Sequence, residues 1–136
     1  MSAVVRIRSK ILEEMIGCAR SQPDIECCGL LAGIESVITK IFPTQNALAS
    51  ATAYEIAPAD LFRLFQRMRE EHLEHLGIYH SHPAGKNIPS PTDIKQALYP
   101  DHAYFILSPL PEDPLPIRAF SIRDQEVEEL RIEALA

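Results

Sequence analysis

The feature that most constrains the fold is the alternation of short apolar runs with amphipathic stretches along 136 residues. Short apolar runs predict buried strands, and apolar residues three to four apart predict helices that cover them. We expect strands at 4–7, 27–34, 37–42, 76–79, 103–107, 117–122 and 127–132. Helices are expected from Ser9, Pro58 and Ser90. Strands and helices alternate first and strands cluster at the end, which predicts an α/β protein with a mixed β-sheet packed with helices. The length favours one domain over residues 1–136.

Local signals refine these elements. Gly33 favours a turn between the second and third strands, which makes them a hairpin. Ser9 is a suitable cap for the first helix, and Pro58 suits the first position of the second. In the third helix, Leu98 is expected to face inward with Ile94 and Ala97. The stretch 43–57 is expected to be irregular, apart from an extended piece near 54–56.

Charge and hydropathy exclude several classes of function. Thirteen basic and nineteen acidic residues give a net charge of -6, without a Lys/Arg run, so we expect no nucleic-acid partner. No stretch approaches the roughly 18 apolar residues that cross a membrane, so no membrane partner is expected. Arg6 and Arg8 interrupt the place where a signal peptide would have its apolar centre, which predicts a cytoplasmic protein.

The three cysteines indicate buried thiols rather than a disulfide framework or a structural zinc site. Their number is odd, two of them are adjacent, and paired C-x-x-C spacing is missing. Apolar residues surround them, so we assign no chemistry to Cys18, Cys27 and Cys28.

One segment carries a distinct chemical pattern, with His80 and His82 at the end of a predicted strand. Residues two apart on a strand point to the same face, with Cα atoms roughly 6.5 Å apart. That separation suits two imidazoles that bind one zinc ion at about 2.0–2.1 Å each.

A short Pro/Gly loop then leads to Ser90 and Asp93 at the start of a predicted helix. The loop can fold the helix start back onto the strand end. Two histidines and one carboxylate leave the fourth tetrahedral position of a zinc ion open for water, as in catalytic sites.

Each half of this pattern has an ordinary structural explanation. A His-x-His pair often lies on a surface, and the segment from Ser90 to Asp93 matches a helix capping box with proline at the first helical position. The combined spacing, however, arises by chance in on the order of one in several thousand chains of this length. Capping and metal binding are also compatible, because a cap fixes the helix start that presents Asp93.

The pattern His80-x-His82-x7-Ser90-x-x-Asp93 resembles the signature of the JAMM (MPN+) zinc metalloproteases, in particular their small prokaryotic type. In that family a glutamate precedes a buried strand far upstream, in a setting similar to the segment from Pro23 to Gly33. Glu26 occupies the matching place, although by itself it would be taken for a solvated charge before a strand. The resemblance extends from the first helix to at least residue 107.

The resemblance implies a JAMM/MPN fold (cytidine-deaminase-like) and one Zn²⁺ per chain, held by His80, His82 and Asp93. It implies that Glu26 is the catalytic general base, which takes a proton from the zinc-activated water and returns it to the leaving amine. It also implies that Ser90 is catalytic and donates a hydrogen bond to the developing oxyanion.

The implied activity is that of a zinc peptidase or isopeptidase of the deubiquitinase-like kind. Its substrate would be the amide bond after the C-terminal Gly-Gly of a ubiquitin-like or sulfur-carrier protein. The chain most resembles prokaryotic relatives that release cysteine or another adduct from a sulfur carrier. The stretch 43–57 is our candidate for the wall of the channel that takes the extended tail. The sequence leaves open whether two copies form a homodimer.

Three alternatives were weighed. A non-catalytic MPN-type scaffold would bind partners only, but such relatives lack the ligand set that this chain carries. A zinc nucleoside deaminase would need H-x-E and P-C-x-x-C, and neither is present. A DNA-associated member of the superfamily is disfavoured by the net charge of -6.

The remaining histidines, and Ser81, could in principle take part in chemistry, but we interpret them as structural residues. His72 and His75 are expected at the surface near the end of the second helix, and His102 in a loop. Ser81, between the two ligand histidines, is expected to pack on the opposite face of the strand.

Overall fold

The computed structural model describes residues 3–136, which form seven strands and three helices. The strands are β1 (Val4–Arg8), β2 (Cys28–Ile34), β3 (Val37–Thr44), β4 (Glu74–Ser81), β5 (Ala103–Leu107), β6 (Ile117–Arg123) and β7 (Glu126–Leu135). The helices are α1 (Ser9–Ser21), α2 (Pro58–Glu70) and α3 (Pro91–Gln96). Every predicted element is present in the predicted order, which confirms the α/β class.

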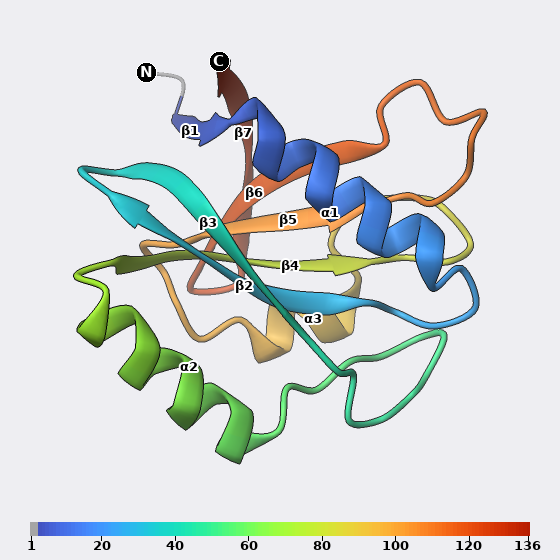
Figure 1. The fold of residues 1–136 in the computed structure, drawn as a ribbon. Helices are drawn as coiled ribbons and strands as arrows, with labels where there is room; N and C mark the ends of the chain where they lie inside the picture. The colour runs from blue at the N-terminus through green and yellow to red at the C-terminus, as the bar shows by residue number, and fades with distance from the viewer. Residues whose placement is uncertain (1–2) are drawn as a thin grey trace.

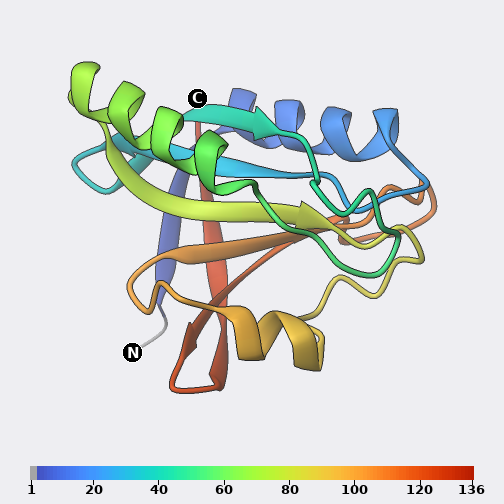
Figure 2. The same cartoon turned by 90° about the horizontal axis from the view of Figure 1, so that it is seen from below.

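The strands form one mixed sheet in the order β1-β3-β2-β4-β5-β6-β7, and this sheet closes on itself. β1 pairs in parallel with both β3 and β7, and β4 pairs in parallel with β5, while the other neighbours are antiparallel. In Figure 2, β1 (dark blue) and β7 (red) lie side by side and cross the direction of β4 and β5. The mixed sheet was predicted, whereas its closure through β1 and β7 was not.

The helices cover opposite faces of the sheet, and Figure 1 shows α1 above the strands with α2 and α3 below them. Alternate residues of β2, β4 and β5 therefore enter two separate cores. The core under α1 includes Ile11, Met15, Leu31, Tyr79 and Phe105. The core under α2 and α3 includes Leu30, Leu64, Met68, Ile78 and Tyr104, with Ile94 packed against it.

The hairpin of β2 and β3 is confirmed, but Gly33 does not form its turn. The turn consists of Glu35 and Ser36, whose φ angles are 52° and 64°. These left-handed angles match the twist of a two-residue hairpin. Gly33 lies within β2 at an irregularity in the register, where an added Cβ would lie 1.7 Å from the carbonyl oxygen of Val37. The glycine is required by this close approach of two backbones.

Three local expectations are corrected or confirmed at the helix ends. Ser9 is the first residue of α1 rather than its cap; the cap is Arg8, without a side-chain hydrogen bond. Pro58 begins α2 as predicted. α3 ends at Gln96, so Leu98 lies beyond it and is 77% exposed instead of facing the core.

The helices are short: α1 and α2 have 13 residues each. Within residues 3–136, no helix has the length and apolar character that crossing a membrane requires.

Candidate metal centre

Four residues singled out from the sequence converge at one end of the sheet. Glu26 lies two residues before β2, His80 in β4, His82 directly after β4 and Asp93 in the first turn of α3. One potential ligand atom from each lies within 4.8 Å of the others. They form a metal site in which the separate role of each residue stays a prediction.

Strand pairing explains how residues far apart in sequence meet. β2 and β4 are antiparallel, with Cys28 opposite His80. Continued by two residues, this register places Glu26 level with His82. His80 shares its face of β4 with Ile78, which is the face covered by α2 and α3. The arrangement therefore follows from the β2–β4 register.

Ser81 supports this register from the opposite face of β4, as predicted. Its side chain is fully buried, and its Oγ accepts a hydrogen bond from the backbone N–H of Cys27 at 2.9 Å. Its own N–H donates to the carbonyl of Cys27 at 3.0 Å. These two bonds fix the residue next to Glu26 against the end of β4.

Three of the four side chains place single atoms at nearly equal separations. Nε2 of His80 lies 3.1 Å from Nε2 of His82, and the Oδ2 atom of Asp93 lies 3.2 Å and 3.1 Å from these nitrogens. A tetrahedral zinc ion with ligands at about 2.0–2.1 Å requires ligand atoms about 3.3 Å apart. The three atoms therefore fit one face of such a coordination shell.

A hydrogen bond on the far side of His82 determines which of its ring nitrogens faces the cluster. Nδ1 of His82 lies 2.9 Å from the carbonyl oxygen of Lys86 and must donate to it. In a neutral imidazole, Nε2 then carries a lone pair that faces the carboxylate of Asp93. A cation between these acceptors removes the repulsion, and the fixed tautomer is the one that metal-binding histidines use.

Burial and mutual contacts shift the pKa values of His80, His82 and Asp93, which we call the trio. Burial acts to raise the pKa of Asp93, but its hydrogen bonds to both histidines outweigh this and hold the pKa far below its usual range. Burial lowers the pKa of His80, although Asp93 opposes this shift. Asp93 is thus predisposed to be a carboxylate, and His80 to be a neutral, buried imidazole.

Ser90 forms the predicted capping box at the start of α3. Its Oγ accepts a hydrogen bond from the N–H of Asp93 at 3.1 Å, and its own N–H donates to Oδ2 of Asp93 at 2.9 Å. That same Oδ2 atom faces both histidines. The cap therefore sets the rotamer of Asp93 as well as the start of the helix.

Glu26 differs from the trio in its surroundings. Its side chain is 4% exposed, and its Oε1 atom has no hydrogen-bond partner within residues 3–136. Burial raises the pKa of Glu26 to about 7, while His82 acts to lower it and Asp93 to raise it. A carboxylate with this pKa can accept and return a proton near neutral pH.

Sequence reasoning missed Tyr54, whose ring stacks on the ring of His80. The two ring centroids are 4.5 Å apart and the planes differ by 23°. The Nδ1 atom of His80 has no hydrogen-bond partner in the described part of the chain. The ring of His80 is thus held by stacking on Tyr54 and by the contacts of its Nε2 atom with His82 and Asp93. The sequence carried no signal for this contact, because Tyr54 lies in an irregular stretch far from the histidines.

A cleft of about 370 Å³ opens beside the site. It is lined by Glu26, Thr52, His82, Ile88 and Ser90, among others. Ala51 and Thr52, from the stretch 43–57, line this cleft. That the stretch forms the wall of a substrate channel stays a prediction.

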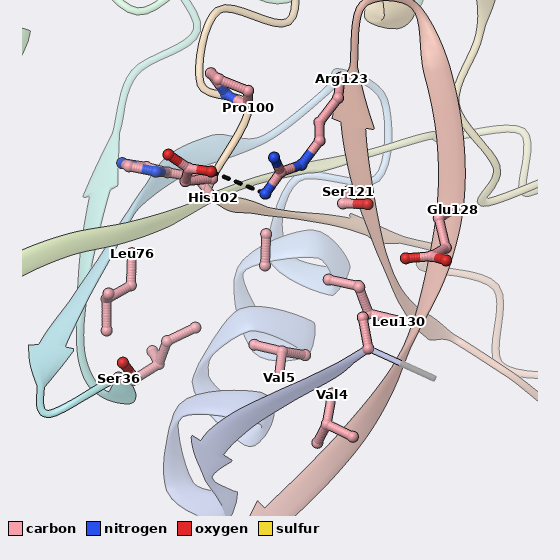
Figure 3. Close-up of a pocket in the computed structure, with 14 residues that line it drawn as sticks. Val4, Val5, Ser36, Leu76, Pro100, His102, Ser121, Arg123, Glu128 and Leu130 are labelled. Carbon is pink, nitrogen blue, oxygen red and sulfur yellow. Dashed lines mark hydrogen bonds and ion pairs between the residues drawn. The ribbon is translucent and has the colours of Figure 1, made fainter. Parts of the chain in front are cut away.

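A second cavity of about 290 Å³ lies at the other end of β4 (Figure 3). Aliphatic side chains such as Val5 and Leu130 line it, and Arg123 donates to Asp101 at 2.8 Å beside it. None of the predicted site residues is among its lining.

The remaining histidines are only partly as expected. His72 is exposed and His102 lies in a loop, as predicted. His75 is not at the surface at a helix end but half-buried in β4, where it packs edge-on against Phe65 and Tyr99. Its Nδ1 lies 3.1 Å from Nε2 of His102, and burial lowers the pKa of His75 to about 4. The prediction for His75 was wrong because β4 begins earlier than its apolar run indicated.

The cysteines are free thiols, as expected. Cys27 and Cys28 are buried and Cys18 is half-buried. Burial raises the pKa of Cys27 to about 11, so this thiol is unreactive at neutral pH.

Comparison with known proteins bears on both the family and the fold. The family model described as prokaryotic homologs of the JAB domain matches residues 8–123. A desampylase of Haloferax volcanii is 32% identical over 112 residues, which cover 80% of this chain and 81% of the relative. A CysO-cysteine peptidase of Mycobacterium tuberculosis is 32% identical over 128 residues, covering 93% of this chain and 88% of the relative.

Among solved structures, a JAB1/MPN domain protein of Archaeoglobus fulgidus superimposes with a TM-score of 0.66. The match covers 99% of this chain and all of the other, at 17% sequence identity. This likeness concerns the fold, and it confirms the fold class expected from the sequence.

Proposed function

This chain belongs to the family of prokaryotic homologs of the JAB domain, and on that premise we propose that it hydrolyses the amide bond after the C-terminal Gly-Gly of a ubiquitin-like or sulfur-carrier protein. The observation that carries the proposal is the convergence of four side chains. Glu26, buried and with a pKa of about 7, lies beside the three ligand atoms of His80, His82 and Asp93.

The chain is a metallopeptidase of the JAMM type. Its relatives include a desampylase and a CysO-cysteine peptidase, and both match over most of their length. The Glu-His-His-Asp cluster supplies the metal site that such an enzyme needs. The sequence-based expectation of an enzyme is confirmed.

Zinc is the metal we propose, one ion per chain, with His80, His82 and Asp93 as its ligands. Two imidazole nitrogens and one carboxylate oxygen form a donor set that zinc accepts in catalytic sites. When bound, zinc supplies Lewis acidity to a substrate carbonyl and to the attacking water.

Two further residues act on protons and charge. Glu26 is the general base that accepts a proton from the attacking water and then donates it to the leaving amine. Its raised pKa supports both steps, because the group changes protonation state near neutral pH. The hydroxyl of Ser90 accepts one bond from Asp93 N–H and retains its own proton, which it donates to the developing oxyanion.

The substrate class follows from the shape of the site and the kind of relatives. The cleft of about 370 Å³ is lined by Glu26 and by small or apolar residues that include Ala84, Gly85 and Ile88. Such a largely apolar surface suits an extended tail without bulky side chains. A CysO-cysteine peptidase among the relatives supports cysteine as one adduct on the far side of the bond.

The experiment that tests this function uses the full chain loaded with zinc and two Gly-Gly-ended carrier substrates. One carries cysteine and the other a small protein, each joined by an amide bond. Zinc per chain is measured by elemental analysis for the wild type, Glu26→Gln and Asp93→Ala. We expect about one zinc and cleavage for the wild type, about one zinc without cleavage for Glu26→Gln, and little zinc for Asp93→Ala.

Two results would contradict the proposal. A wild type that takes up no zinc even after reconstitution would leave the scaffold as the better account. A Glu26→Gln variant that cleaves at the wild-type rate would remove Glu26 from the mechanism.

A further inference from the structure

We infer that Asn46 is a positioning residue that holds Glu26, the general base, in its place beside the metal site. Asn46 is 7% exposed, lies in the irregular stretch after β3 and has no part in the mechanism described above. The inference rests on the proposed function, because it concerns how the base of that reaction is held.

The side chain of Asn46 satisfies its hydrogen-bonding capacity with backbone groups. Its Nδ2 donates to the carbonyl oxygens of Glu26 at 3.0 Å and of Ala53 at 2.9 Å. Its Oδ1 accepts from the N–H groups of Leu48 at 3.0 Å and of Glu55 at 3.1 Å. A buried amide with four such partners cannot be replaced without leaving backbone groups unpaired.

The backbone of Glu26 depends on these contacts because it lies outside the sheet. β2 begins only at Cys28. The N–H of Glu26 donates to the carbonyl of Ser50 at 2.8 Å, and its carbonyl accepts from Asn46. Both bonds come from the stretch 45–57, which Asn46 holds together through its bonds to Leu48, Ala53 and Glu55, so this stretch fixes the backbone of the base.

The side chain of Glu26 offers no alternative anchor. Its Oε1 is buried and has no hydrogen-bond partner within residues 3–136. A carboxylate without such a bond is positioned by its own backbone and by packing. A backbone shift is therefore passed directly to the reacting oxygen atoms.

Asn46 also connects Glu26 with the ring that orients a metal ligand. It bonds to Ala53 and Glu55, on either side of Tyr54. The ring of Tyr54 stacks on His80 at 4.5 Å. The buried amide of Asn46 thus links the backbone of Glu26 to the segment that carries Tyr54, whose ring supports His80.

The test compares the zinc-loaded wild type with Asn46→Ala and Asn46→Asp. The aspartate keeps both accepted bonds that shape the loop and loses the two donated ones. Steady-state kinetics on the Gly-Gly carrier substrate are combined with zinc analysis and amide hydrogen exchange by NMR. Ile11→Val is the control, since it removes a methylene from the core under α1, on the other face of the sheet from His80.

We expect both Asn46 variants to bind about one zinc and to lose roughly 100-fold in kcat, with KM changed by less than about threefold. The amide of Glu26 should exchange at least about tenfold faster, while that of Leu31 in β2 is unchanged. Ile11→Val should retain its kcat.

Other outcomes overturn the inference. These are a kcat within about twofold of the wild type, or an exchange rate that rises equally at Glu26 and Leu31. If the wild type itself does not cleave, the proposed function fails, and the exchange rates alone then decide whether Asn46 holds Glu26.

Discussion

Single atoms in this site serve two purposes at once. Oδ2 of Asp93 accepts a hydrogen bond from the N–H of Ser90 and also faces His80 and His82. Nδ1 of His82 donates to Lys86, which directs the other nitrogen towards the cluster. The hydrogen bonds behind the cluster therefore determine which lone pairs point into it.

Ser90 offers a test at this scale, because its hydroxyl caps α3 and is also proposed to stabilise an oxyanion. We expect Ser90→Ala to keep zinc and to lower kcat by roughly 10²–10³, since a donor aimed at the developing charge is lost. The free energy of unfolding should fall by about 1 kcal/mol, because the cap is lost. Carrier cleavage, zinc content and urea unfolding measure the three effects.

Ser90→Thr is the matched control, since it keeps both the cap and the hydroxyl, and it should retain most of the activity. If Ser90→Ala is less stable but turns over as fast as the wild type, Ser90 is a helix cap only.

Among the elements, short pieces of structure place the reactive groups. α3 has only six residues, yet its first turn carries Asp93, and its capping box fixes that turn. The hairpin of β2 and β3 fixes β2, whose register against β4 brings Glu26 level with His82. The position of Glu26 relative to His82 therefore depends on how closely β2 packs against β3 and β4.

Gly33 tests that dependence. We expect Gly33→Ala to lower the free energy of unfolding by at least about 3 kcal/mol, because the new Cβ would lie 1.7 Å from the backbone oxygen of Val37. Gly17→Ala is the control: it lies within α1, and nothing lies within 4 Å of its added Cβ. This control should gain about 0.5–1 kcal/mol from helix propensity.

Urea unfolding of both variants measures the difference. A Gly33→Ala protein as stable as the wild type would show that β2 and β3 can separate without loss.

Across the whole molecule, the candidate metal site links α3 to the ends of β2 and β4, which the sheet already pairs. Its residues come from the segment before β2, from the end of β4 and from α3. An ion bound here cross-links these parts in the folded chain and has no comparable site in the unfolded chain.

Zinc should therefore stabilise the whole fold. At free zinc about 100 times its dissociation constant, we expect a gain of about 2.7 kcal/mol in the free energy of unfolding. Removing zinc with a chelator should abolish this gain in the free energy of unfolding. Asp93→Ala should show no gain, whereas Asp101→Ala, which removes an exposed carboxylate beside the other cavity, should keep it. Urea unfolding with and without zinc is the measurement, and an equal gain in both variants would place the ion elsewhere.

Local sequence patterns were enough to identify the strands, the helices and the candidate metal ligands His80, His82 and Asp93. The spacing of apolar residues indicated every strand and helix, because that spacing reflects only residues close together along the chain. The spacing from His80 to Asp93 indicated the metal site, because a strand end, a short loop and a capped helix keep these residues together. Glu26, far upstream, was found only through the family resemblance.

Other features of the fold and the site depend on contacts between residues that are distant in sequence, and these could be seen only in the folded chain. The closure of the sheet requires β1 to pair with β7, and no local pattern encodes that contact. The stacking of Tyr54 on His80 and the four bonds of Asn46 arise in an irregular stretch without periodicity. Gly33 resembled a turn residue, yet the approach of another strand requires it. Local patterns thus indicated the candidate ligands, while long-range packing positions Glu26, the proposed base, and the ring of Tyr54 beside His80.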